Sequence, residues 1–256
     1  MRFRKSHGWM TALLCASALA GCAKISSDAS GDAANKQQVA ALPGSSWDSI
    51  KQLPDWSGVW VNYRGPDAGR TDDMALTPKY KEIVETAQRD KHQANLSTCL
   101  PAGPTAVLQH AILYEFLFTP GRVTMLFEDG EIRRIHTDGR EHLPLADLSN
   151  SFMGDSIGHW EGNTLVVDTI GFPNGEIWTN YGVRATRNTH MVERLQINQA
   201  GRMQIDTVIT DPEIFTAPYT RHREYQRTEL PITEPTCLQN NRDTGTEMDL
   251  TPPPEE

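Results

Sequence analysis

The sequence lacks most of the motifs that mark well-known enzyme classes. Only four of its 256 residues are cysteine, and no two of them form a Cys-x-x-Cys pair, so dithiol redox chemistry of that type has no support. The phosphate-binding Walker loop and the glycine fingerprint of dinucleotide-binding folds are both absent. NTPase and Rossmann-type functions therefore have no motif behind them, and we expect no organic cofactor.

Positive charge is also scarce. The chain contains 24 Lys and Arg against 33 Asp and Glu, a formal net charge of -9. A phosphate backbone is repelled by such a chain, so nucleic acid is not expected as a partner. After residue 20 no apolar run is long enough to span a bilayer. We therefore expect any tie to a membrane to come from the N-terminus.

The first 21 residues have the pattern of an export signal, in which a basic stretch (residues 2–5) precedes a short apolar run (residues 9–20). Leu19-Ala20-Gly21-Cys22 resembles the lipobox of bacterial lipoproteins, which implies cleavage before Cys22 and lipidation of its thiol. An aspartate just after the lipidated cysteine signals retention in the inner membrane, and here Ala23 and Lys24 follow Cys22. The resemblance therefore implies a periplasmic protein anchored in the outer membrane. An ordinary secretory signal, with Cys22 left as a thiol, is the alternative.

The remaining cysteines form an even pair. Cys15 leaves with the signal and Cys22 carries the lipid, so Cys99 and Cys237 remain in an oxidising compartment. A disulfide between these two is the simplest interpretation, and two buried thiols or a redox pair are the alternatives. Such a bond joins the start of the folded region to its C-terminal tail.

Composition divides the mature chain into three parts. Residues 22–52 are rich in small and polar residues and nearly free of large apolar side chains, so we predict a disordered tether. Residues 53–243 have the composition of a single globular domain. Residues 244–256, which end in Pro-Pro-Pro-Glu-Glu, are predicted to be a disordered tail.

The domain is predicted to be almost entirely β-structure. Nine strand-like runs alternate with turn residues such as Asp129-Gly130 and Ala200-Gly201. The runs lie at residues 56–63, 115–119, 123–128, 131–137, 151–160, 164–172, 189–198, 202–211 and 219–229. One flanking helix is expected, with Thr77 as N-cap and Pro78 as its first residue. Because almost no helix connects the strands, we expect one antiparallel, up-and-down β-barrel, whose closure removes the sheet edges.

Gly58-Val59-Trp60, on the first strand, resembles the Gly-x-Trp motif that opens lipocalin and related calycin barrels. The resemblance implies that an arginine from the last strand covers Trp60, and Arg221, Arg223 and Arg227 lie on that strand. It also implies a barrel that holds one small, mostly apolar ligand.

A longer stretch, from Gly154 to Phe172, resembles a signature of a large family of exported bacterial proteins, mostly of unknown function. It reads Gly-Asp-Ser-Ile-Gly-His-Trp-Glu-Gly-Asn-Thr-Leu-Val-Val-Asp-Thr-Ile-Gly-Phe, and the likeness runs from Trp56 to Asp243. Many members have His where this chain has Asp155, and Arg where it has His159. The resemblance suggests cofactor-free cleavage of lignin-type aryl ethers.

Two acidic residues stand out within the predicted strands. Asp168 lies in a strand whose two faces are both apolar or Thr-rich, so its carboxylate is expected to be shielded and to find donors or change its pKa. It is either a general acid or base inside the barrel or a structural carboxylate. Glu193 lies among core-facing apolar residues, and it either takes part in catalysis or pairs with Arg133 or Arg134.

A histidine can complete such a site. His159 ends its strand on the face of Asp155, and pairing Trp160 with Thr164 across the turn brings both within a diagonal step of Asp168. An exposed histidine without a catalytic part is the alternative. No two histidines have the spacing of a zinc motif, so no metal site is assigned, and a metal ion held across several strands is the remaining alternative.

The ligand is expected to lie against aromatic side chains, with residues 174–188 as a lid. The predicted binding residues are Trp60, Phe127, Trp178, Tyr181 and His190.

Taken together, these features predict an enzyme that cleaves a small aromatic or apolar molecule without an organic cofactor. Asp168 and Glu193 would be its acid and base, His159 a proton relay beside Asp155, and Arg134 the group that stabilises developing negative charge. A lipocalin-like carrier or sensor and a structural envelope protein are the alternatives. The mechanism requires both carboxylates to reach one cavity.

Overall fold

The computed structural model describes residues 42–65, 74–89, 101, 103–104, 108, 112–149, 151–173, 183 and 185–233. The predicted lipidation site at Cys22 and the predicted Cys99–Cys237 bond lie outside these residues. So do the predicted ligand residues Trp178 and Tyr181.

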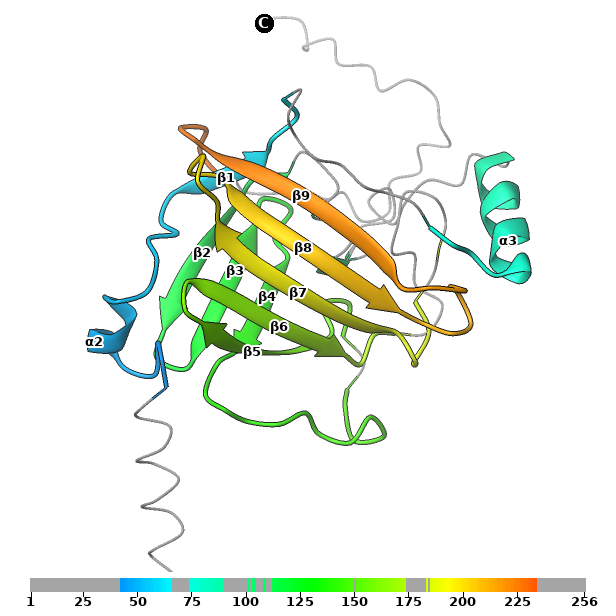
Figure 1. Cartoon of the computed structure of the whole chain (residues 1–256), viewed down its shortest axis with the longest axis horizontal. Helices are drawn as coiled ribbons and strands as arrows, with labels where there is room; N and C mark the ends of the chain where they lie inside the picture. Colours follow the sequence, from blue (N-terminus) through cyan, green and yellow to red (C-terminus); the bar gives the residue numbers. More distant parts are fainter. Residues whose placement is uncertain are drawn as a thin grey trace, which may run out of the picture.

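Nine strands form one closed barrel, in which each strand pairs with the next and β1 closes against β9 (Figure 1). The strands are β1 (Val59–Asn62), β2 (Tyr114–Thr119), β3 (Arg122–Phe127), β4 (Ile132–His136), β5 (Asp155–Glu161), β6 (Thr164–Ile170), β7 (His190–Ile197), β8 (Met203–Thr210) and β9 (Tyr219–Thr228). Among the described residues there are two helices, α2 (Trp47–Ile50) and α3 (Pro78–Arg89). The predicted all-β barrel with a flanking helix is confirmed.

One strand pair is parallel, where the sequence predicted only antiparallel neighbours. β4 and β5 run in the same direction, with Ile135 opposite Ser156. A parallel pair needs a crossover connection of a dozen or more residues. The connection over residues 137–154 is long enough to return the chain to the same end of the barrel, and it passes outside the sheet (Figure 1).

Residues 42–52, which the sequence assigned to the tether, are more ordered than predicted, because α2 forms within them. Ser46 and Ser49 make a capping box, in which each side-chain oxygen accepts a hydrogen bond from the backbone N–H of the other residue. The Gly44 carbonyl also accepts a hydrogen bond of 2.9 Å from the N–H of Gly121, in the β2–β3 turn. A four-residue helix is not stable by itself. These contacts hold it beside β2 (Figure 1).

Helix α3 begins at Pro78, as the sequence predicts, and buries Tyr80 and Val84. The hydroxyl of Thr77 donates to the carbonyl of Glu213 at 2.8 Å, so this side chain joins the helix start to the β8–β9 connection. No helix in the described part of the chain is long and apolar enough to cross a bilayer.

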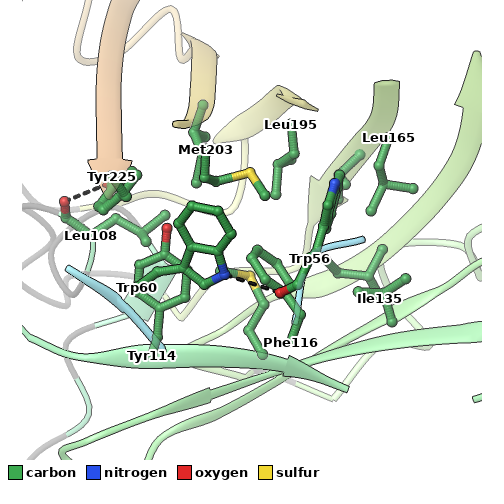
Figure 2. Packing of buried hydrophobic residues seen from close by; sticks show 14 of the residues in the cluster. Trp56, Trp60, Leu108, Tyr114, Phe116, Ile135, Leu165, Leu195, Met203 and Tyr225 are labelled. Carbon is green, nitrogen blue, oxygen red and sulfur yellow. Dashed lines mark hydrogen bonds between the residues drawn. The ribbon is translucent and has the colours of Figure 1, made fainter. Parts of the chain in front are cut away.

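Two apolar clusters, the second of which extends out of the barrel to α3, have polar side chains between them. The first cluster, part of which Figure 2 shows, includes Trp56, Trp60, Tyr114, Phe116, Phe127, Ile135, Leu165, Leu195, Met203 and Tyr225. The second includes Leu76, Tyr80, Val84, Phe172, Met191, Ile209, Phe215 and Tyr219. Between them lies a set of buried, inward-facing polar residues, which we call the polar belt: Arg133, Ser156, Thr169, Glu193, Thr207, Arg221 and Arg223.

Arg227 is the arginine that covers Trp60. The two residues are opposite each other in the β1–β9 ladder, and the guanidinium carbon lies 4.7 Å from the centre of the indole ring. Arg227 also donates to the carbonyls of Ser57 and Asp55, at 2.9 and 2.7 Å. Arg221 and Arg223, the other two candidates, face the interior instead. The cation–π contact and the two hydrogen bonds of Arg227 thus stabilise the pairing of β1 with β9, which closes the barrel.

Candidate acid–base site

Four side chains on the outer face of the barrel form one continuous chain of hydrogen bonds, which we call the Asp–His chain. His142 Nδ1 lies 2.6 Å from Asp155 Oδ2, and His142 Nε2 lies 3.0 Å from Asp168 Oδ1. The second oxygen of Asp168 lies 2.7 Å from His190 Nε2. Two carboxylates and two imidazoles therefore alternate along a single path.

The register of the sheet explains why these residues meet. Ile157 lies opposite Asp168, and Asp168 lies opposite Val192, so Asp155 and His190 are each one diagonal step from Asp168 on the same face. His142 comes from the crossover connection and lies over this face. The connection that makes the β4–β5 pair parallel thus also supplies the central member of the chain.

His142 has one carboxylate at each ring nitrogen. An ionised carboxylate only accepts hydrogen bonds, so a ring nitrogen that contacts one must carry the proton. The geometry fits an imidazolium between two carboxylates, or a neutral imidazole with the proton transferred to one aspartic acid. Each of these contacts is short enough for the histidine and the carboxylate to share a proton.

The four side chains are accessible to small molecules, since between 20% (His142) and 43% (Asp168) of their surface is exposed. His136, at the end of β4, lies near Asp155. Burial lowers the pKa of His136, and the positive charge of Arg140 lowers it further, while Asp155 and Asp138 oppose this change. The neutral form of His136 is favoured beside the chain.

A cleft of about 240 Å³ begins at Thr210, one strand away from the His190 end of the Asp–His chain. Thr210 is the cross-strand partner of His190 and shares its face of the sheet, and Thr210 also lines the cleft. The other walls include Pro212, Phe215 and Pro218, so the cleft is mainly apolar. It is smaller than the roughly 300–1,000 Å³ of sites for drug-sized ligands, which suits a molecule with a single ring.

The predicted convergence of Asp168 and Glu193 in one cavity is wrong. Asp168 shares the outer face with its cross-strand partner Val192, so Glu193, the next residue along the strand, points into the barrel. Glu193 is 1% exposed, whereas Asp168 is 43% exposed and not shielded as predicted. The two carboxylates cannot act together on one substrate because the sheet separates them.

The predicted roles of Arg134 and His159 also lack the expected geometry. Arg134 is exposed on the outer face of β4, and it is Arg133 that pairs with Glu193 inside. His159 is 67% exposed, and its Nε2 contacts Glu161 at 3.2 Å instead of Asp168. The observed register pairs Glu161 with Thr164, one residue away from the predicted pairing of Trp160 with Thr164.

The predicted aromatic ligand residues that the structure describes lie in the packed interior. Trp60 and Phe127 are both nearly fully buried in the first cluster, where Trp60 Nε1 donates to the carbonyl of Trp56 at 3.0 Å (Figure 2). A cleft of about 320 Å³ between the α2 segment and β2 does have aromatic walls, which include Phe116 and Phe118. It lies at the Trp160 end of the barrel, away from the Asp–His chain at the Asp155 end.

The sequence also contains a serine pattern that is typical of hydrolases, but its serine, Ser156, belongs to the polar belt. Gly154-Asp155-Ser156-Ile157-Gly158 has the Gly-x-Ser-x-Gly spacing of hydrolases, in which the serine lies on a sharp turn between a strand and a helix. Here Ser156 lies within β5, is 2% exposed, and hydrogen-bonds to Arg133 and Thr169. The serine is therefore an interior structural residue.

The described residues contain no group of three or more His, Cys, Asp or Glu arranged to hold a metal ion. No protein-family model matches the chain, and a search of curated proteins likewise returned no match. The function is therefore argued from the geometry of the Asp–His chain and the cleft beside it.

Proposed function

We propose that this protein is an enzyme that cleaves a small aromatic or apolar molecule, of the aryl ether or ester type, by acid–base catalysis at the Asp–His chain. The observation that carries the proposal is that the chain ends at His190, whose cross-strand neighbour Thr210 lines an apolar cleft of about 240 Å³. A general acid or base needs a titratable group within reach of the substrate and partners that hold its orientation. His190 has the position of the acting group, and Asp168 orients it.

The rest of the chain has a role in this proposal. When His190 takes up a proton, the carboxylate of Asp168 at its Nε2 stabilises the imidazolium, as the carboxylate of a hydrolase triad does. His142 holds the other oxygen of Asp168. Asp155 holds the other nitrogen of His142 at 2.6 Å. A non-catalytic carrier or sensor, the second candidate, needs the cleft but has no use for four linked titratable groups.

The location of the protein is part of the proposal. We infer from the lipobox-like residues before Cys22 that the chain is a periplasmic lipoprotein of the outer membrane, with a Cys99–Cys237 disulfide. Mass spectrometry of the N-terminal and cysteine-containing peptides tests both points. An unmodified Cys22 or two free thiols would contradict them.

We also propose the relationship to calycin barrels and to the exported family with the Gly154–Phe172 signature. The closed barrel and the contact of Arg227 with Trp60 support the first of these. The barrel alone does not identify a substrate, since one fold can carry many functions.

The experiment is a turnover assay with a panel of aryl ethers and aryl esters, using the wild-type protein, Asp168→Asn and Glu161→Gln. Glu161 is a matched control because it is also exposed on the outer face and pairs with a histidine, His159. We expect turnover of at least one panel compound, reduced about 10²- to 10⁴-fold by Asp168→Asn and unchanged by Glu161→Gln. If compounds bind but none is converted, the carrier hypothesis holds instead.

A further inference from the structure

The polar belt inside the barrel contains more positive than negative side chains. Arg133, Arg221 and Arg223 are at most 4% exposed, and Glu193 is the one acidic member of the belt as defined above. Burying a guanidinium is costly unless it is paired and hydrogen-bonded. The belt lies between two apolar clusters, so its charges have little access to bulk water.

The guanidinium of Arg133 has hydrogen-bond acceptors for only some of its donors. Its Nε donates to Ser156 Oγ at 3.2 Å, and its Nη2 donates to Thr169 Oγ1 at 3.0 Å and to the carboxylate of Glu193. Its Nη1 is buried and has no hydrogen-bond partner within the described part of the chain. A buried charged donor without an acceptor loses its hydration and gains nothing in return.

Two further guanidinium groups of the polar belt come from β9, and both have interactions of their own. Arg221 and Arg223 point inward from β9, and Thr207 of β8 is the cross-strand partner of both Arg221 and Glu193. Burial raises the pKa of the neighbouring Tyr225, while Arg221 and Arg223 oppose this rise. The charges of these two arginines therefore act within the barrel.

We propose that the polar belt is a binding site for the carboxylate of a small ligand whose apolar body packs against the clusters beside it. A carboxylate oxygen would accept from Arg133 Nη1, as guanidinium groups commonly bind carboxylates. Glu193 already holds one negative charge there, so a monoanion meets less repulsion than a phosphate dianion. This interior site is separate from the Asp–His chain and does not depend on the proposed function.

The test is the thermal unfolding midpoint of the full-length chain in increasing benzoate, with benzyl alcohol as a neutral probe and sodium chloride at equal ionic strength. A ligand that binds only the folded protein raises the midpoint as its concentration rises. We expect benzoate to raise it and the other two additions to leave it unchanged. We also expect the benzoate effect to disappear in the Arg133→Met/Glu193→Gln variant, which removes both members of the buried pair together.

Arg134→Met is the matched control, because it removes the same charge from the same strand on the exposed face. It should keep the full benzoate effect. The proposal is overturned if benzoate has no effect on the wild type, if benzyl alcohol has the same effect, or if Arg133→Met/Glu193→Gln responds as the wild type does. Any of these results means that water or another group of the protein serves Arg133 Nη1.

Discussion

His142 and Asp168 lie 3.0 Å apart, between Nε2 and Oδ1, and join a connecting segment to the middle of a barrel strand. The same histidine contacts Asp155 through its other nitrogen. A loop residue that binds two strand residues at once fixes the path of its connection over the sheet. It also links two carboxylates that the sheet alone would leave without a common partner.

The buried ion pair of Arg133 and Glu193 predicts a difference between single and double variants. Arg133→Met leaves Glu193 buried without its partner, so we expect a loss of about 3–5 kcal/mol in the free energy of unfolding. Arg133→Met/Glu193→Gln removes both charges and should recover most of this loss. Urea denaturation measures the free energy of unfolding of each variant. The control is Arg134→Met, on the exposed face of the same strand, which we expect to change this free energy by less than about 0.5 kcal/mol. Equal losses in the single and the double variant would contradict this account of the pair.

The closure of the barrel at Trp60 predicts that Arg227→Met is destabilising. The substitution removes the cation–π contact at 4.7 Å and the hydrogen bonds to two carbonyls. We expect a loss of about 1–2 kcal/mol in the free energy of unfolding. Arg194→Met, which removes one ion pair with Glu161 on the outer surface, is the control and should have a smaller effect. A loss no larger than that of the control would show that the Trp60 contact does not stabilise the fold.

His136 predicts a decrease in stability at mildly acidic pH. Its pKa in the folded protein is lowered below the usual 6.5, so the unfolded chain binds its proton more readily. The stability that neutral His136 contributes to the fold is therefore fully present above pH 6.5 and is lost as the pH falls below that value. We expect the thermal midpoint of the wild type to drop more between pH 7.5 and pH 5 than that of His136→Asn. The same drop in both proteins would assign the pH dependence to other groups.

The fold was largely predictable because local patterns determine most of it. Asp129-Gly130 and Ala200-Gly201 mark two of the turns between antiparallel strands, and in the structure Gly130 and Gly201 both have positive φ. The parallel β4–β5 pair was not predictable, because the described residues between β4 and β5 form no helix that would suggest a crossover. Only the ladder itself shows that β5 runs in the same direction as β4.

The candidate site was predicted in part. Asp155, Asp168 and His190 were selected from their strands, and the structure brings these three together. His142 was missed because it lies in a segment without strand periodicity, where residue type is the only available signal. A shift of one residue at the Gly162 turn was enough to pair Ser156 with Thr169 inside instead of with Asp168.

The interior was predicted less well, because a strand pattern does not show what the facing wall contains. Glu193 was correctly expected among core residues, with Arg133 or Arg134 as its partner. Alternation along β4 places Arg133 and Arg134 on opposite faces of the sheet, but it does not say which face is the inner one. The structure shows that Ile135 and its partner Ser156 are buried, so Arg133, which shares the face of Ile135, is the inner arginine.

The proposed acid–base function is tested most directly by comparing the turnover of His190→Gln with that of His159→Gln on the same aryl substrate. His190 belongs to the Asp–His chain, and its cross-strand neighbour Thr210 lines the cleft. His159 is exposed farther along β5 and contacts Glu161 instead of Asp168. The account predicts that kcat/KM falls about 10²- to 10⁴-fold in His190→Gln and stays within about twofold of the wild type in His159→Gln. Equal activity in the two variants would contradict it.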